Sequence, residues 1–439
     1  MDPNVKERLL ASIEANRLIL LAGAGLSMAP PSSAPSAAAL AATCFDEYTA
    51  MANPGCNVAM RWDLEALAEY FFNQQTLQTV FIDRLVPWGQ FNGQPNLGHA
   101  AIADFLLTRA AAAALSSNYD ILIERRAWDY GAQFDASLDG DEANVHAAVH
   151  SPFLKFHGCA HRDRRETVWT KLQLGEPSVS TRLAKNGKWM ASNLRERDLL
   201  IVGFWSDWSY LNEILGDALG NVSPLSVTLV DPGSIAALEA KAPGLWALAH
   251  KSGVTFAHVQ ESGAVVLDEL RRAFSAGYLR RMLRSGAPHL EHETKTPCDP
   301  AWLDVADGDS EWLYAQRRDA EGVPSTKPAR QRQPHNSELL GFFHLLLKRG
   351  GAIHRADGYE INGRKVRVIN GAGSVLSSLR SRFVEAPAVS SPDVIAAVGS
   401  TDLALPGNVI RDGRPKDIVR PATPGEWFDF QSARELLKI

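Results

Sequence analysis

The segment Asn16–Ser27 constrains the fold of this chain more than any other, because it joins a short apolar run to a turn with two glycines. Leu18–Leu21 is branched and apolar, as expected for a buried strand of a parallel sheet. Gly23 and Gly25 let the backbone turn sharply, and a helix that begins after such a turn presents N–H groups to an anion. Position 28 is methionine, so the three-glycine dinucleotide fingerprint is incomplete. The pattern predicts a strand, a turn and a helix start, whose role is either ligand binding or purely structural.

Four later segments each place small or polar residues after an apolar run. They are Ala110–Leu115 before Asn118-Tyr-Asp120, Phe153–Phe156 before His157-Gly158, Leu199–Val202 before Gly203 and Ser206, and Val227–Val230 before Asp231. Ligands bind beyond the carboxyl ends of strands in open parallel sheets, so these residues are expected to line one crevice. We therefore predict an α/β fold, a Rossmann-like parallel sheet with helices on both faces.

In this order, the glycine turn and the four strand ends resemble the NAD-binding landmarks of the sirtuin-like family. The matching residues are Gly23–Ser27, Asn118-Tyr-Asp120, His157-Gly158, Gly203 with Ser206 and Asp207, and Asp231. The resemblance covers roughly the first two-thirds of the chain. It implies that NAD binds here, with its diphosphate held by Gly23, Ala24, Gly25 and Ser27 and its adenosine half by Gly203, Ser206 and Asp231.

Three residues are assigned to the chemistry of the nicotinamide–ribose bond. Asn118 carries a donor and an acceptor without charge, which suits it to orient a ribose hydroxyl or an attacking water. Asp120 is expected to bind the nicotinamide amide and to favour the developing cation. His157 is expected to act as a base near neutral pH. Each has a structural alternative: Asn118 and Asp120 can form an Asx turn, and His157 can be a buried histidine bonded to a carbonyl.

The chain departs from the sirtuin deacylases in its cysteines and in its cofactor loop. A structural zinc ion needs four closely placed ligands, but the cysteines form no Cys-x-x-Cys pair, and Cys159 with His161 supplies only two ligands. No zinc or other metal site is therefore expected. The loop Pro30–Ser36 lacks the Phe-Arg ending of the deacylase cofactor loop. This pattern resembles the bacterial sirtuin-like proteins of antiphage defence, which implies hydrolysis of NAD.

Three functions follow as hypotheses. The favoured one is an NAD hydrolase (an NAD glycohydrolase) that releases nicotinamide and ADP-ribose and depletes NAD when activated. The second is a protein deacylase or ADP-ribosyltransferase, and the third is a regulatory module that senses NAD or ADP-ribose without turnover. Because free NAD cleavage is toxic, restraint is expected through a homo-oligomer or a partner from a defence operon, such as a HerA-type ATPase or a prokaryotic Argonaute.

Composition limits the other classes of function. A net charge of −5 over 439 residues argues against a chain-wide nucleic-acid surface, so no direct nucleic-acid binding is expected. Four cysteines in a chain of this length indicate a reducing compartment. The charged N-terminal segment does not read as a signal peptide, and no apolar run is long enough to span a membrane. A cytoplasmic protein is expected.

The chain is expected to divide into three parts. Residues 1–285 form the sirtuin-like domain, with a helical insert at 37–51, 63–72 and 76–85. His99 begins a further helix, where a cap or a packed imidazole is favoured over the alternative of a catalytic role. Residues 286–335, rich in proline and charge, form a linker or arm. Residues 336–439 form a small α+β unit for assembly or partner binding, with a helix capped by Asn336 or Ser337 and a hairpin turning at Asn362-Gly363.

Overall fold

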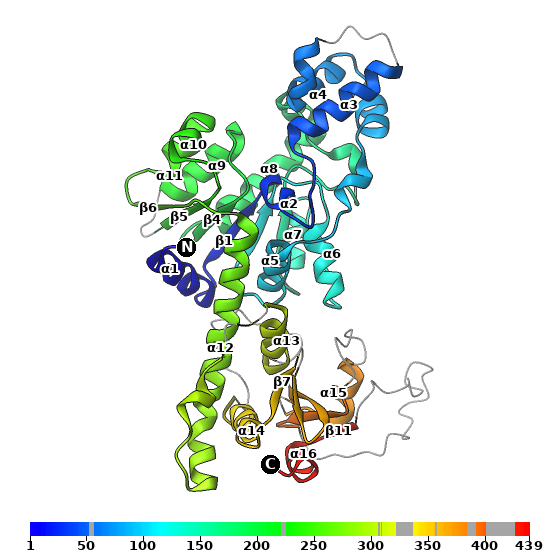
Figure 1. The fold of residues 1–439 in the computed structure, drawn as a ribbon. Coiled ribbons are helices and arrows are strands. Elements are labelled where there is room, and N and C mark those ends of the chain that lie inside the picture. The colour runs from blue at the N-terminus through cyan, green and yellow to red at the C-terminus, as the bar shows by residue number, and fades with distance from the viewer. Residues whose placement is uncertain are drawn as a thin grey trace. The chain divides into compact units, whose positions relative to one another are not determined.

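The structure is a computed structural model that describes residues 1–51, 57–220, 225–305, 308, 310–321, 337–355, 358–371, 373–383, 392–400 and 426–439 (Figure 1). It divides into two compact units. The first holds Met1–Trp128 with Ala132–Leu270, and the second holds Asp129–Gly131 with Arg271–Ile439. Whether the boundaries 285 and 335 delimit independently folding domains stays a prediction.

The first unit is built on a six-stranded parallel sheet with the order β3-β2-β1-β4-β5-β6. Its strands are β1 (Leu18–Ala22), β2 (Ala113–Ser116), β3 (Phe153–Lys155), β4 (Asp198–Val202), β5 (Leu225–Val230) and β6 (Val254–Val259). The chain runs outward from β1 to β3 and then returns to lay β4 against the other side of β1, so the strand order reverses there. The predicted Rossmann-like fold is confirmed. Sequence reading found every strand except β6, whose side chains are mostly half-exposed at the sheet edge.

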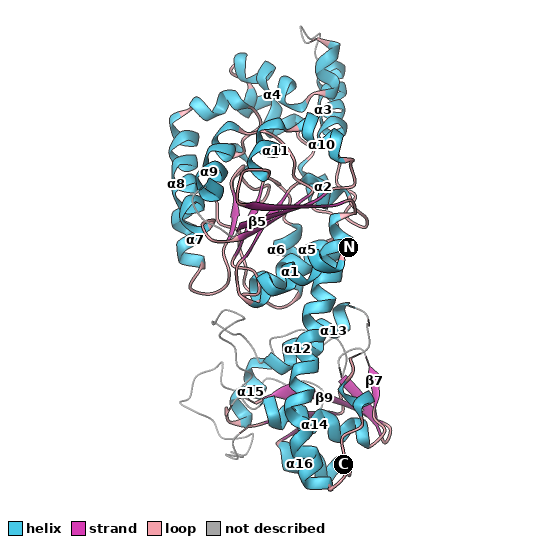
Figure 2. Ribbon diagram, turned by 90° about the vertical axis from the view of Figure 1, so that its left-hand side faces the viewer, coloured by secondary structure: helices cyan, strands magenta, loops and turns pink. Residues whose placement is uncertain are grey.

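Helices cover both faces of this sheet, with α1 and α5 on one side and α11 on the other (Figure 2). The regular helices of this unit are α1 (Pro3–Glu14), α2 (Ala24–Met28), α3 (Ala37–Met51), α4 (Leu64–Asn73), α5 (Leu97–Leu107), α6 (Leu122–Asp129), α7 (Gly140–His146), α8 (Pro177–Asn193), α9 (Ser209–Gly220), α10 (Ile235–Lys241) and α11 (Pro243–Ala249). Shorter or distorted turns are η1 (Val58–Trp62), η2 (Leu77–Leu85), η3 (Trp88–Phe91), η4 (Arg164–Glu166) and η5 (Lys171–Gly175).

Strand β1 lies in the middle of the core, and all five of its residues are buried. Ile19 and Leu21 join one cluster with side chains of α8, α9 and α11, among them Met190 and Leu215. Full burial of each such side chain stabilises the fold by about 1.5–3 kcal/mol. The predicted insert is also helical: α3, α4 and η2 share a separate apolar cluster centred on Phe71.

The second unit is built on a mixed five-stranded sheet with the order β11-β10-β9-β8-β7. Its strands are β7 (Ile353–Arg355), β8 (Gly358–Ile361), β9 (Arg364–Asn370), β10 (Val394–Val398) and β11 (Glu426–Phe428). Its helices are α12 (Gly263–Thr294), which begins in the first unit, α13 (Ser310–Glu321), α14 (Ser337–Arg349), α15 (Leu376–Phe383) and α16 (Phe430–Leu437), with the short turn η6 (Pro300–Leu303).

The predicted hairpin is confirmed as β8 and β9. Asn362 and Gly363 have φ values of 51° and 74°, as the two central residues of a type I′ turn require. The predicted helix over 339–347 is α14. The proposed cap Asn336 lies outside the described residues.

Parts of the interval 286–335, which was expected to be a linker or arm, are helical. Helix α12 continues to Thr294 through Pro288, and α13 packs against β9. One of the charges that suggested a solvated segment is paired instead: Nε and Nη2 of Arg367 each donate to the Asp319 carboxylate at 2.8 Å. A charged helix therefore belongs to the interior of the second unit.

Candidate functional site

The loops after β1 and β4 touch backbone to backbone where the strand order reverses. The Gly23 N–H donates to the Val202 carbonyl at 3.0 Å, and the Gly25 N–H donates to the Gly203 carbonyl at 3.0 Å. Gly203 has a φ of +64°, and a Cβ built there would lie 2.3 Å from the Leu26 nitrogen. These glycines are therefore required by the approach of the two loops to each other. The Gly25 N–H was expected to bind a phosphate, but it donates to the Gly203 carbonyl instead.

Ser27 lies at the centre of a buried polar cluster formed by Ser27, His99, Asn118 and Asp120, which we call the Ser27 cluster. Its hydroxyl donates to Asp120 Oδ2 at 2.8 Å. The same oxygen accepts from Asn118 Nδ2 at 3.1 Å and lies 3.1 Å from His99 Nε2. Three predicted site residues, Ser27, Asn118 and Asp120, are thus brought together by the ends of β1 and β2.

The proton positions in the Ser27 cluster follow from the bonds of His99. Its Nδ1 accepts from the Asn96 N–H at 3.1 Å and caps α5, so Nε2 carries the proton and donates to Ser27. Burial lowers the pKa of His99 to about 4, which keeps the ring neutral. Ser27 then uses its one proton and both lone pairs. It is not the nucleophile of a Ser-His-Asp triad, because His99 donates to it rather than accepting from it.

Asp120 is held from two further directions. Its Oδ1 accepts from the Leu122 N–H at 3.2 Å, which is the Asx turn considered from the sequence. Its backbone carbonyl accepts from Lys155 Nζ, and that ammonium lies 2.5 Å from Glu124 Oε1. Although burial opposes the charge of Lys155, the nearby Glu124 carboxylate raises its pKa above the usual value. Sequence reading missed this ion pair, since Lys155 stands inside an apolar strand pattern.

His157 follows β3 and is only 4% exposed. Its ring centre lies 4.4 Å from that of Trp208 and 6.3 Å from that of Tyr210. Burial, and secondarily the charge of Arg182, lowers its pKa to about 3, so the ring is neutral. Its Nε2 makes no hydrogen bond to any described residue. Within the described residues no hydrogen bond joins His157 to the Ser27 cluster, although both lie at the carboxyl edge of the sheet.

Two residues that the sequence analysis did not assign accompany His157, and with Trp208 they complete what we call the His157 cluster. Arg182 donates from Nη1 to Glu166 at 3.0 Å, while its Nε and Nη2 are buried without a partner among the described residues. The hydroxyl of Tyr210 is also buried and unbonded there. Buried polar atoms are normally paired, so three such groups together indicate a place that receives a ligand. Arg182 lies on α8, a helix the sequence analysis did not predict.

The remaining predicted residues lie along β4 and β5, apart from the Ser27 cluster. Asp231 is partly exposed and accepts from the Gly233 N–H at 2.7 Å, which shapes its own loop. Ser206 is exposed. Asp207 accepts from the Gly244 and Leu245 N–H groups at 2.9 and 2.8 Å and so caps α11. Burial opposes the charge of the Asp207 carboxyl, but a hydrogen bond from the Asn212 side-chain amide and the two backbone N–H bonds hold its pKa below the usual value.

Comparisons with known proteins return likenesses in structure alone. No family model matches the chain, and no curated protein matches it. A Sir2 homologue solved as an NAD complex is 15% identical, covers 61% of this chain and 93% of its own, and aligns with a TM-score of 0.37. A Sir2 homologue mutant solved with ADP-ribose is 17% identical, with coverages of 62% and 96% and a TM-score of 0.37. A structure on sirtuin substrate affinity is 14% identical, with coverages of 62% and 98% and a TM-score of 0.34.

The described residues contain no group of three or more histidine, cysteine or acidic residues arranged to hold a metal ion. Cys56 lies outside the described residues, and burial raises the pKa of Cys44 to about 12. Within the same part of the chain, none of the helices combines the length and the apolar character that crossing a membrane requires.

Proposed function

We propose that the first unit binds NAD at the carboxyl edge of its sheet and hydrolyses the nicotinamide–ribose bond. The observation that carries this proposal is the presence of two separate polar clusters at that edge. The Ser27 cluster presents an oriented amide and carboxylate, and the His157 cluster presents a neutral base whose Nε2 is unpaired. The resemblance of these residues to the sirtuin-like landmarks supplies the identity of the ligand.

Cleavage of this bond leaves positive charge on the ribose, and a carboxylate held nearby favours that charge. Asp120 suits this role because Ser27 and the Leu122 N–H fix its two oxygens from one side. Asn118 donates one amide N–H to Ser27, so its carbonyl oxygen and second N–H can bind a ribose hydroxyl or a water. Both groups are positioned before the substrate arrives, which is what electrostatic catalysis requires.

His157 would complete the reaction as the base. Water attacks the ribose carbon as the bond to nicotinamide breaks, and His157 accepts the proton that the water loses. The products are nicotinamide and ADP-ribose. A lowered pKa keeps His157 in the neutral form at physiological pH, although it also makes the ring a weak base until NAD changes its surroundings. Arg182 and Tyr210 are placed to bind polar atoms of the substrate beside it.

The adenosine half would lie toward β4 and β5, along Gly203, Ser206 and Asp231. The diphosphate would lie over the exposed residues Ala24 and Gly25. Because the Gly25 N–H and the Ser27 hydroxyl are already engaged, the structure supports fewer direct phosphate contacts than the sequence suggested. In the cell we propose that activation of this hydrolase depletes NAD as an antiphage response, with assembly or a defence-operon partner as the restraint.

One specific observation favours the alternative of a nucleotide sensor. The Gly25 N–H and the Ser27 hydroxyl already form hydrogen bonds within the protein, as they would in a loop with a purely structural role. A sensor would bind NAD or ADP-ribose without releasing nicotinamide, so product analysis separates the two functions.

The test is chromatography of NAD incubated with the full chain, alone and with the product of a neighbouring gene. We expect nicotinamide and ADP-ribose in equal amounts, and a loss of at least a hundredfold in rate for Asn118→Ala and for His157→Ala, a typical effect of removing such groups. His161→Ala is the matched control, because that histidine is exposed. Near wild-type turnover by either folded site variant would contradict the site assignment, and binding without products would favour the sensor.

A further inference from the structure

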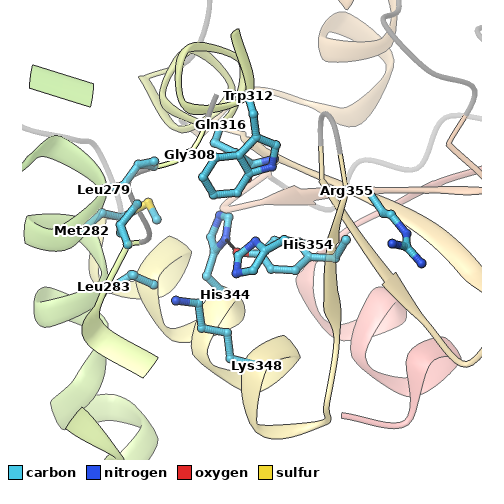
Figure 3. A pocket seen from close by; sticks show the side chains of 12 residues that line it. Leu279, Met282, Leu283, Gly308, Trp312, Gln316, His344, Lys348, His354 and Arg355 are labelled. Carbon is cyan, nitrogen blue, oxygen red and sulfur yellow. Dashed lines mark hydrogen bonds between the residues drawn. The ribbon is translucent and has the colours of Figure 1, made fainter. Parts of the chain in front are cut away.

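The second unit contains a cavity of about 530 Å³ that the proposed NAD chemistry does not use. Its walls come mainly from α12, α13, α14, β7 and β8, so it lies wholly within that unit. Figure 3 shows Leu279, Met282 and Leu283 on one side, Trp312 on another, and His344 between them. A cavity of this size with apolar walls and few polar groups is typical of a small-molecule site.

Several polar residues line this cavity, and one of them, His344, is only 2% exposed. Its Nδ1 lies 2.7 Å from the Tyr359 hydroxyl. Burial raises the pKa of Tyr359 well above its usual value, so the phenol keeps its proton, and His344 is the acceptor in reach. The Tyr359 O–H therefore donates to Nδ1, and the proton of the neutral imidazole is on Nε2. That Nε2 is buried and makes no hydrogen bond within the described part of the chain.

The charge of the cavity is positive. None of the twelve described residues that line it is acidic. Lys348 donates to the Trp302 and Asp304 carbonyls at 2.7 and 3.1 Å, which leaves one of its three N–H groups for a ligand. Arg355, the other cation of the lining, is paired with Glu360 at 2.7 Å. His344 and Lys348 are one helical turn apart on α14, so their donors lie on the same face of that helix.

We propose that this cavity binds a small molecule that combines an aromatic ring with an anionic oxygen group. The ring would lie between the apolar side chains of α12 and the ring of Trp312, whose centre is 5.1 Å from that of His354. The anionic oxygen would accept from His344 Nε2 and from the free N–H of Lys348. A carboxylate and a phosphate share this chemistry, and the second unit thereby becomes a receptor for a small aromatic anion.

The experiment measures binding to the full chain by calorimetry with three probes: naphthalene-2-carboxylate, its neutral carboxamide, and adenosine 5′-monophosphate. We expect the carboxylate to bind about tenfold more tightly than the carboxamide, as a hydrogen bond to a charged group is stronger than one to a neutral group. Competition by the nucleotide would extend the site to phosphates, and its failure would restrict the ligand to carboxylates.

Variants locate the binding. His344→Phe keeps a ring but removes the Nε2 donor, and it should weaken the carboxylate about tenfold. Lys348→Met should abolish the preference for carboxylate over carboxamide, whereas Arg349→Met, an exposed cation on the same helix, should leave it unchanged. If His344→Phe fails to fold, Met282→Trp fills the cavity instead and should block binding. Equal affinity for the two naphthalene probes, no binding at millimolar concentration, or full binding by Met282→Trp would overturn the proposal.

Discussion

The hydroxyl group of Ser27 forms hydrogen bonds with three other side chains. Replacing Ser27 by alanine leaves the His99 Nε2–H, the Asn118 amide and the Asp120 carboxylate each short of a buried partner. We expect Ser27→Ala to lower the free energy of unfolding by about 1–3 kcal/mol, the usual cost of a buried group left unsatisfied. We also expect it to slow NAD cleavage, because Asn118 and Asp120 lose their orientation.

Denaturant unfolding and NAD turnover of this variant should change together. Ser180→Ala is the control, since that exposed serine bonds only to a carbonyl of its own helix. A Ser27→Ala protein as stable and active as the parent would show that the Ser27 cluster is not a working unit.

The residues of this cluster were within reach of sequence reasoning, because each follows a strand and parallel strands end at one edge. Lys155, Glu124 and Arg182 were not. A charged side chain in an apolar strand or on a helix gives no sign of burial until its partner is known, and Glu124 lies thirty-one positions from Lys155. The neutral state of His157 likewise depends on burial by Trp208 and Tyr210, which no spacing rule supplies.

At the scale of elements, α13 shows how composition misleads. Its sequence is rich in charge and suggested a linker, yet Asp319 is 5% exposed at its side chain and pairs with Arg367 of β9. We expect Asp319→Ala to lower the free energy of unfolding of the second unit by about 3–5 kcal/mol, because it removes the carboxylate that accepts two hydrogen bonds from the largely buried Arg367.

The exposed pair Arg355–Glu360 is the control for this effect, and Glu360→Ala should cost no more than about 1 kcal/mol. Chemical denaturation followed by circular dichroism compares the two variants. Equal losses would mean that α13 is peripheral, as the sequence suggested.

Strong turn signals such as Asn362-Gly363 were predicted correctly, since two positive φ values leave little choice of residue.

At the scale of the whole molecule, buried histidines tie stability to pH, and His99, His157 and His344 have the lowest pKa values among those that are most deeply buried. Burial lowers the pKa of His99 to about 4 and those of His157 and His344 to about 3. The unfolded chain binds protons at these residues near pH 6.5, while the folded chain does not until much lower pH. Their contribution is therefore fully present above about pH 6.5 and is lost as the pH falls from there toward the folded pKa values.

Each histidine should lower the free energy of unfolding by at most about 1.4 kcal/mol for each pH unit that the pH falls within that window. Thermal unfolding between pH 7.5 and 4.5 should show the trend, and His99→Gln should reduce the slope for the first unit. His161→Gln is the control variant for this measurement, because that side chain is exposed. A stability that stays level to pH 4.5 would contradict the neutral, buried state assigned to these rings.

The central claim is that NAD lies across the carboxyl edge of the first sheet with its nicotinamide end between the two clusters. A crystal structure of the Asn118→Ala variant soaked with NAD tests it most directly, since slow cleavage would preserve the substrate. We predict the nicotinamide ring beside His157 and Trp208, and the diphosphate over the loop that begins at Gly23. NAD bound elsewhere, or no NAD at a saturating concentration, would contradict this account.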